Sequence, residues 1–94
     1  MNAIEEQRRP ALARGVRIGT DPKTNEPMLL FPEGVIYLNP TAHDIVKRCD
    51  GQVTTQSLIA ALADEYETDV EALRHDVLDC LADLHQRKVL VFCK

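Results

Sequence analysis

The sequence predicts an α+β domain in which a three-stranded antiparallel sheet is followed by three helices. Short β-branched and aromatic runs, separated by turn-forming residues, fill positions 14–38, and apolar residues then recur with helical spacing as far as about residue 87. The chain has 94 residues, of which 45% are apolar. This length suits one hydrophobic core, because two halves of it would each bury too little surface to fold alone.

Three strands are expected between residues 16 and 38. Val16 and Ile18 alternate with polar neighbours, segment 28–31 reads Met-Leu-Leu-Phe, and segment 35–38 reads Val-Ile-Tyr-Leu. The segments between them contain the Pro, Gly, Asp and Asn residues that form turns. Residues 1–13 show no consistent apolar period, so we expect a flexible N-terminal arm before a domain that spans residues 14–94.

Three helices are expected after the strands, at about residues 40–49, 54–68 and 70–87. Asn39 is suited to cap the first helix, and Pro40 is tolerated at its first position because that amide has no partner within the helix. Residues 89–92 then read as a short terminal strand. Strands combined with short helices joined by tight turns indicate a winged helix-turn-helix-like architecture.

Composition excludes several classes of function. A net charge of −4 and a sequence pI near 5.2 oppose a surface that neutralises phosphate, so nucleic acid is not expected as a partner. No apolar run approaches the roughly 20 residues that span a bilayer, and the N-terminus is too polar for a secretory signal, so we expect a cytoplasmic protein without membrane contact. Three cysteines without C-x-x-C spacing favour reduced thiols, and we expect no metal or cofactor.

Four segments of the chain form an ordered set with compatible spacing: Arg14-Gly15-Val16-Arg17, Leu29-Leu30-Phe31-Pro32-Glu33-Gly34, Leu38-Asn39-x-Thr41-Ala42 and Cys49-Asp50-Gly51-x-x-Thr54. Together they resemble the PqqD family of pyrroloquinoline quinone (PQQ) biosynthesis proteins, over roughly residues 14–92. Val53 and Phe31 depart from the family pattern, in which a basic residue and a Tyr are frequent at these positions.

This resemblance implies a RiPP recognition element, a non-catalytic peptide chaperone of winged-helix type. Such a protein would bind the precursor peptide PqqA and present it to the radical SAM enzyme PqqE. The resemblance further implies that the peptide is held as an added strand against the third strand, in a cleft closed by the third helix. In this chain those elements correspond to residues 34–39 and 69–87.

Candidate peptide contacts follow from the expected faces of these two elements. If Ile36 and Leu38 face the core, Val35 and Tyr37 face away on an open edge. On the helix, Leu78 lies about 80° from Val70, outside the apolar stripe. The helix candidates are Arg74, Leu78, Ala82 and His85. Different roles are open to two of these side chains, since Leu78 can pack at the edge of a broad core and Tyr37 can cover a neighbouring helix.

DNA binding and self-association are the alternative functions. Helix-turn-helix folds often bind DNA, but residues 69–86 hold five acidic side chains and Arg74 as the one fixed cation, which disfavours phosphate. An unpaired strand edge accepts a second copy of the chain as readily as a peptide, so a homodimer is a competing use of this surface. His75 and Asp79 have the spacing of metal ligands, although we expect them to be solvated.

Overall fold

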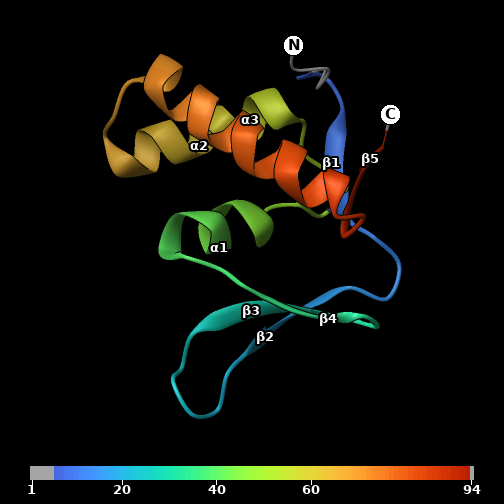
Figure 1. Ribbon diagram of the computed structural model, residues 1–94. Coiled ribbons are helices and arrows are strands. Elements are labelled where there is room, and N and C mark those ends of the chain that lie inside the picture. Colours follow the sequence, from blue (N-terminus) through green and yellow to red (C-terminus); the bar gives the residue numbers. More distant parts are fainter. Residues whose placement is uncertain (1–5, 94) are drawn as a thin grey trace.

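The structure is a computed structural model that describes residues 6–93 (Figure 1). In chain order the elements are β1 (Arg9–Leu12), β2 (Arg17–Thr20), β3 (Pro27–Phe31), β4 (Gly34–Tyr37), α1 (Pro40–Val46), α2 (Thr55–Tyr66), α3 (Val70–Gln86) and β5 (Leu90–Cys93). The expected α+β class, with a three-stranded antiparallel sheet and three helices, is confirmed. Figure 1 shows the three helices stacked above one face of this sheet.

The three-stranded sheet has the order β2-β3-β4, which makes β4 an edge strand. Its register places Ile18, Leu29 and Ile36 in one row, and Leu29 at the centre of that row is fully buried. This row therefore lies on the inner face of the sheet, where α1 packs against β3. The opposite face carries the neighbouring rows, which include Val35 and Tyr37.

A second sheet corrects the expectation of a flexible arm. β1 pairs antiparallel with β5, from Arg9 opposite Cys93 to Leu12 opposite Leu90. The edge of β1 that faces away from β5 is also hydrogen-bonded. The amide of Gly51 donates to the carbonyl of Pro10 at 2.9 Å, and the amide of Thr55 donates to the carbonyl of Arg8 at 2.9 Å. The prediction of an arm is thus wrong for the described residues 6–13, while residues 1–5 lie outside the described part of the chain.

The helix boundaries follow their expected caps. The side-chain oxygen of Asn39 accepts a hydrogen bond from the amide of Ala42 at 2.7 Å, and Thr54 caps α2 in the same way through the amide of Ser57 at 3.1 Å. The first helix ends at Val46, earlier than the expected Cys49. The amide of Cys49 donates to the carbonyl of Val46 at 3.0 Å, so the chain continues in a tighter turn.

The core lies between the three helices and the inner face of the sheet. It includes one apolar side chain from β3, two or more from each helix, and the pair Val89 and Leu90, of which Leu90 begins β5. Within residues 6–93 no helix combines the length and apolar character that crossing a membrane requires. The sheet and α3 thereby share one core, which fixes the position of β4 relative to the helix.

Candidate functional site

The candidate site begins with the open edge of β4. Within residues 6–93, no strand pairs with the side of β4 that faces away from β3. Val35 and Tyr37 are 47% and 53% exposed, whereas Ile36 is half-buried against the core and Leu38 is buried. The structure therefore places the four strand candidates with the alternation expected of an edge strand.

The hydrogen-bond pattern shows which backbone groups are available at this edge. The amide of Leu38 donates to the carbonyl of Pro27 at 2.9 Å, and Met28 lies opposite Tyr37 in the register. Hydrogen-bonded and non-hydrogen-bonded pairs alternate along an antiparallel ladder. The backbone N–H and C=O groups of Val35 and Tyr37 consequently point to the free edge, where another strand can pair with them.

The side chain of Tyr37 is anchored locally instead of covering a helix. Its hydroxyl donates a hydrogen bond to the carboxylate of Asp21 at 2.8 Å. The pKa of Asp21 is lowered, first by the amide of Lys23, which donates to the same carboxylate at 2.8 Å, and then by Tyr37. The pKa of the Tyr37 hydroxyl is raised by this hydrogen bond. The contact fixes the ring beside the β2–β3 loop and leaves the strand edge open.

Two cavities place residues of α3 close to the residues that flank the two ends of β4. One cavity lies between α1 and α3. It is lined by Asn39, after the end of β4, by Thr41, Ala42 and Ile45 of α1, and by Asp76, Asp79 and Cys80 of α3. The other is lined by Glu33, before the start of β4, and by Arg87 at the end of α3. The two spans have similar lengths, about 20 Å for the extended chain and about 17 Å for the helix.

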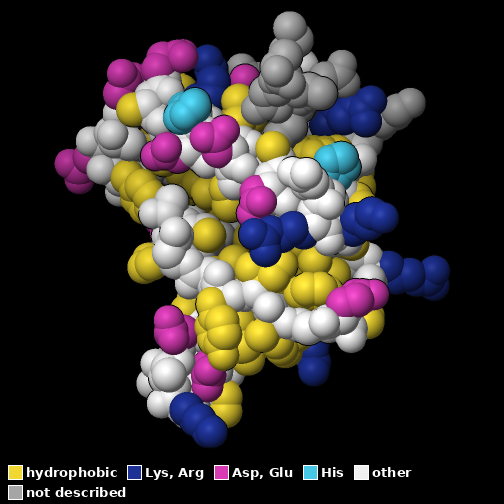
Figure 2. Space-filling model, viewed as in Figure 1, with side chains coloured by type: hydrophobic (Ala, Val, Ile, Leu, Met, Phe, Trp, Pro, Cys, Tyr) yellow, Lys and Arg dark blue, Asp and Glu magenta, His cyan; other side chains and the backbone are white. Residues whose placement is uncertain are grey.

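We name the space between residues 33–39 and this side of α3 the β4–α3 groove. Its helix side carries Asp76, Cys80 and Arg87, which lie four and seven residues apart and so share one side of a helix. Partly buried apolar side chains line the two ends of the groove. They comprise Val16, Phe31, Ala42 and Cys80. Figure 2 shows apolar side chains exposed in the band between the helices and the sheet.

The thiol of Cys80 lines the same cavity as the carboxylates of Asp76 and Asp79. Burial raises the pKa of Cys80 to about 11, and the nearby carboxylate of Asp83 adds to the shift. The thiol is therefore neutral at physiological pH and contributes apolar surface, not a nucleophile. Cys49, buried behind it, has its pKa raised to about 12 by burial.

The four helix candidates do not lie in the groove. Arg74 forms ion pairs with Glu71 at 2.8 Å and with Glu6 at 3.4 Å, and the ring of His85 meets the ring of Phe92 edge-on, 5.2 Å between centroids. Leu78 is half-buried against the core. This flank of α3 thus faces the N-terminal segment and β5.

Helix geometry places Leu78 and Cys80 about 160° apart, so the candidate leucine and the groove cysteine lie on opposite flanks of the apolar stripe. Ala82 follows Leu78 by four residues and is half-buried on the same side of the helix. The structure therefore places Arg74, Leu78, Ala82 and His85 away from the two cavities, whereas the expectation put them in the groove wall. Asp76, Cys80 and Arg87 were missed, because the sequence marks two flanks of the stripe without showing which one faces the sheet.

No catalytic or metal-binding arrangement stands out at the groove. The Nε2 atom of His75 lies 3.2 Å from a carboxylate oxygen of Asp79, and both side chains are exposed. Among residues 6–93, no three His, Cys, Asp or Glu side chains gather as potential metal ligands. The features the groove does offer are unpaired backbone groups and apolar surface, which are the requirements for binding an extended peptide.

Comparison with known proteins points to one family. The family model of coenzyme PQQ synthesis protein D (PqqD) matches residues 26–90. The PqqA binding protein of Xanthomonas axonopodis pv. citri is 33% identical over 90 residues, which cover 96% of this chain and 98% of that protein. Its counterpart in Xanthomonas campestris pv. campestris (strain B100) is 32% identical over the same coverage.

Solved structures agree with the sequence comparison. The solution structure of the PqqD part of Methylobacterium extorquens PqqCD, a functional and stand-alone RiPP recognition element, is 33% identical with a TM-score of 0.82, and the match covers 96% of each chain. The crystal structure of PqqD from Xanthomonas campestris is 31% identical with a TM-score of 0.57, covering 92% of this chain and 96% of that one. The chain therefore belongs to the PqqD family of coenzyme PQQ synthesis proteins.

Proposed function

We propose that this protein is a peptide chaperone of PQQ biosynthesis that binds the precursor peptide PqqA in the β4–α3 groove and presents it to the radical SAM enzyme PqqE. The observation that carries the proposal is the open edge of β4 beside an apolar groove, in a member of a family whose relatives are PqqA binding proteins. The protein itself catalyses no step, and PqqE supplies the chemistry.

Strand addition supplies the geometry of binding but little of its free energy. Four or five backbone hydrogen bonds contribute about 0.5–1.5 kcal/mol each, while ordering a flexible peptide costs about 2–5 kcal/mol or more. Micromolar affinity corresponds to about −8 kcal/mol. Apolar side chains of the peptide must therefore enter the groove, and the half-buried surface that includes Ala42 and Cys80 is available to them.

The contacts in the proposed complex divide between the two walls of the groove. Val35 and Tyr37 contribute their outward backbone groups, while Ile36 and Leu38 keep the strand in register through the core. On α3, the proposed contacts are Asp76, Cys80 and Arg87. Acidic groups on this flank of α3 disfavour DNA as the ligand.

An NMR titration of labelled protein with synthetic PqqA tests the proposal. Amide shifts concentrated at residues 33–39 and at the Asp76, Cys80 and Arg87 side of α3 are expected. Shifts at Arg74 and His85 instead would move the site to the other flank. Shifts at β4 that grow with protein concentration and ignore the peptide would favour the competing dimer. Presentation is tested separately, by turnover of PqqA by purified PqqE with and without this protein.

A further inference from the structure

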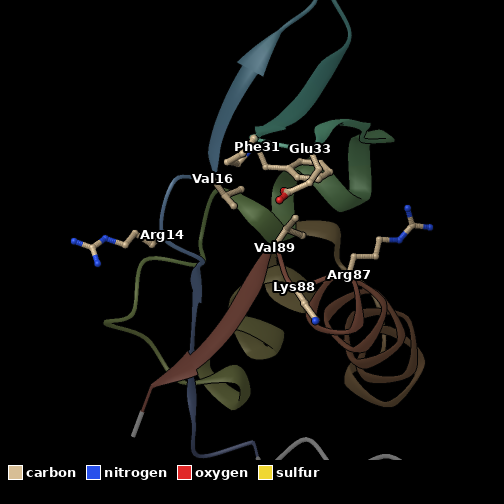
Figure 3. A pocket seen from close by; sticks show the side chains of 8 residues that line it. Arg14, Val16, Phe31, Glu33, Arg87, Lys88 and Val89 are labelled. Carbon is tan, nitrogen blue, oxygen red and sulfur yellow. The ribbon is translucent and has the colours of Figure 1, made fainter.

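Of the two cavities that define the β4–α3 groove, the one at the Glu33 end of β4 has the greater volume, about 470 Å³. Three apolar side chains, Val16, Phe31 and Val89, line it from the ends of different strands (Figure 3). Val89 is 1% exposed, and the other two are half-buried against the core. The cavity floor is thus built on the core and holds its shape without a ligand.

Charged side chains surround this floor. Arg14, Arg87 and Lys88 contribute three cations to the lining, against one carboxylate from Glu33. Arg87 also pairs with Asp83 at 3.2 Å. In Figure 3 the side chains of Arg14 and Arg87 extend outward on opposite sides, while the carboxylate of Glu33 hangs over the apolar floor. The rim is therefore cationic, and the floor is apolar with one anion above it.

We propose that this cavity is the anchor pocket of the bound peptide, and that it takes one large apolar side chain, aromatic or aliphatic, from a segment with acidic neighbours. The inference rests on the proposed function, because it assumes a strand added to β4. The cavity adjoins the turn that precedes β4, through Pro32 and Glu33, and the segment that precedes β2, through Arg14 and Val16. Its volume lies within the range of ligand pockets.

The chemistry of the cavity selects this occupant. Burying apolar surface yields about 25 cal/mol per Å², so one large side chain supplies the free energy that backbone hydrogen bonds lack. A carboxylate is disfavoured on the floor itself by desolvation and by the anion of Glu33. At the rim, carboxylates of adjacent peptide residues meet Arg14, Arg87 and Lys88, which can swing inward on long, exposed side chains.

A substitution at Glu33 can fill the pocket without touching the core. In E33F, an aromatic ring replaces the carboxylate above Val16, Phe31 and Val89, so we expect the affinity for synthetic PqqA to fall at least tenfold in titration calorimetry. E33A empties the space above the floor and should bind at least as well as wild type. D64F makes the same chemical change at an exposed position of α2 and should leave affinity unchanged.

The peptide side of the test identifies the anchor. Each large apolar residue of PqqA is replaced by Ala in turn, and one replacement should weaken binding to wild type about tenfold while weakening binding to E33F no further. R14E should lower affinity about threefold and reduce its dependence on salt. If PqqA binds wild type and E33F equally, the anchor pocket is refuted and the proposed function stands. If PqqA does not bind wild type, both are refuted.

Discussion

The two flanks of α3 belong to one helix but have different surroundings. One flank, with Arg74, Leu78 and His85, contacts the protein's own N-terminal segment and β5. The other flank, with Cys80 and Arg87, lines the cavities beside Asn39 and Glu33, the two residues that flank β4. The comparison teaches that the packing of the rest of the chain, and not the local sequence of the helix, decides which flank of α3 stays open.

The first test of this comparison compares the paired strand β5 with the open edge strand β4. Leu90 is fully buried in β5 opposite Leu12 of β1, so L90A should lower the free energy of unfolding by about 2–5 kcal/mol through lost burial and a residual cavity. V35A, on the open strand β4, should change it by less than about 0.5 kcal/mol, because its side chain is exposed. Urea denaturation measures both. Similar losses for the two variants would contradict the assignment of closed and open strands.

Proline substitutions test the open edge itself. V35P removes an amide that points away from β3 and places a ring at the edge, so PqqA affinity should fall at least tenfold while the fold is retained. I18P is the matched control, because Ile18 lies on β2 at the opposite edge of the same sheet, where the register also directs its amide outward. Titration calorimetry compares the two. Equal weakening by both variants would show that a general distortion of the sheet, and not a lost edge, lowers the affinity.

A substitution on the flank of α3 that contacts β5 tests whether that flank contributes to stability and not to peptide binding. H85A removes the edge-on ring contact with Phe92 and should cost about 0.5–1.5 kcal/mol of stability. Its affinity for PqqA should stay within about twofold of wild type, because the proposed peptide site lies on the other flank. A large loss of affinity without a loss of stability would return the site to the flank that carries Arg74 and His85.

Thiol reactivity tests whether the peptide covers Cys80, and its expected effect is the smallest of the four. Because the pKa of Cys80 is raised to about 11, iodoacetamide should modify it slowly at pH 8, and the rate should keep rising with pH up to about 11. Exposed Cys93 should react faster and serves as the internal reference. Saturating PqqA should slow the modification of Cys80 and leave that of Cys93 unchanged, as peptide mass spectrometry would show. Equal protection of both thiols would indicate a global effect.

Much of this fold is predictable because its signals are local. Turn residues separate the strands of the three-stranded sheet, and Asn39 caps α1 with the hydrogen bond that its position predicts. β1 escaped prediction because its partner β5 lies some 80 residues away in the chain and a four-residue strand has almost no period of its own. The long-range pairing, not the intrinsic preference of residues 9–12, makes that segment a strand.

The candidate site was predictable on one of its two sides. The alternation of Val35 to Leu38 is a local property of a strand, and the structure shows it. The helix side depends on which flank of the apolar stripe faces β4, which only the packing of α3 against both sheets determines. Cys80 belongs to the edge of the stripe in sequence, so its place in the groove becomes visible only in three dimensions.

Amide hydrogen exchange at the edge of β4 tests the central claim most directly. Exchange rates of the Val35 and Tyr37 amides, measured by NMR with and without saturating PqqA, report whether a strand has been added. We predict strong slowing at both amides, with the amide of Ile18 on the opposite edge unchanged. Binding of PqqA that leaves Val35 and Tyr37 exchanging at their free rates would contradict strand addition at β4.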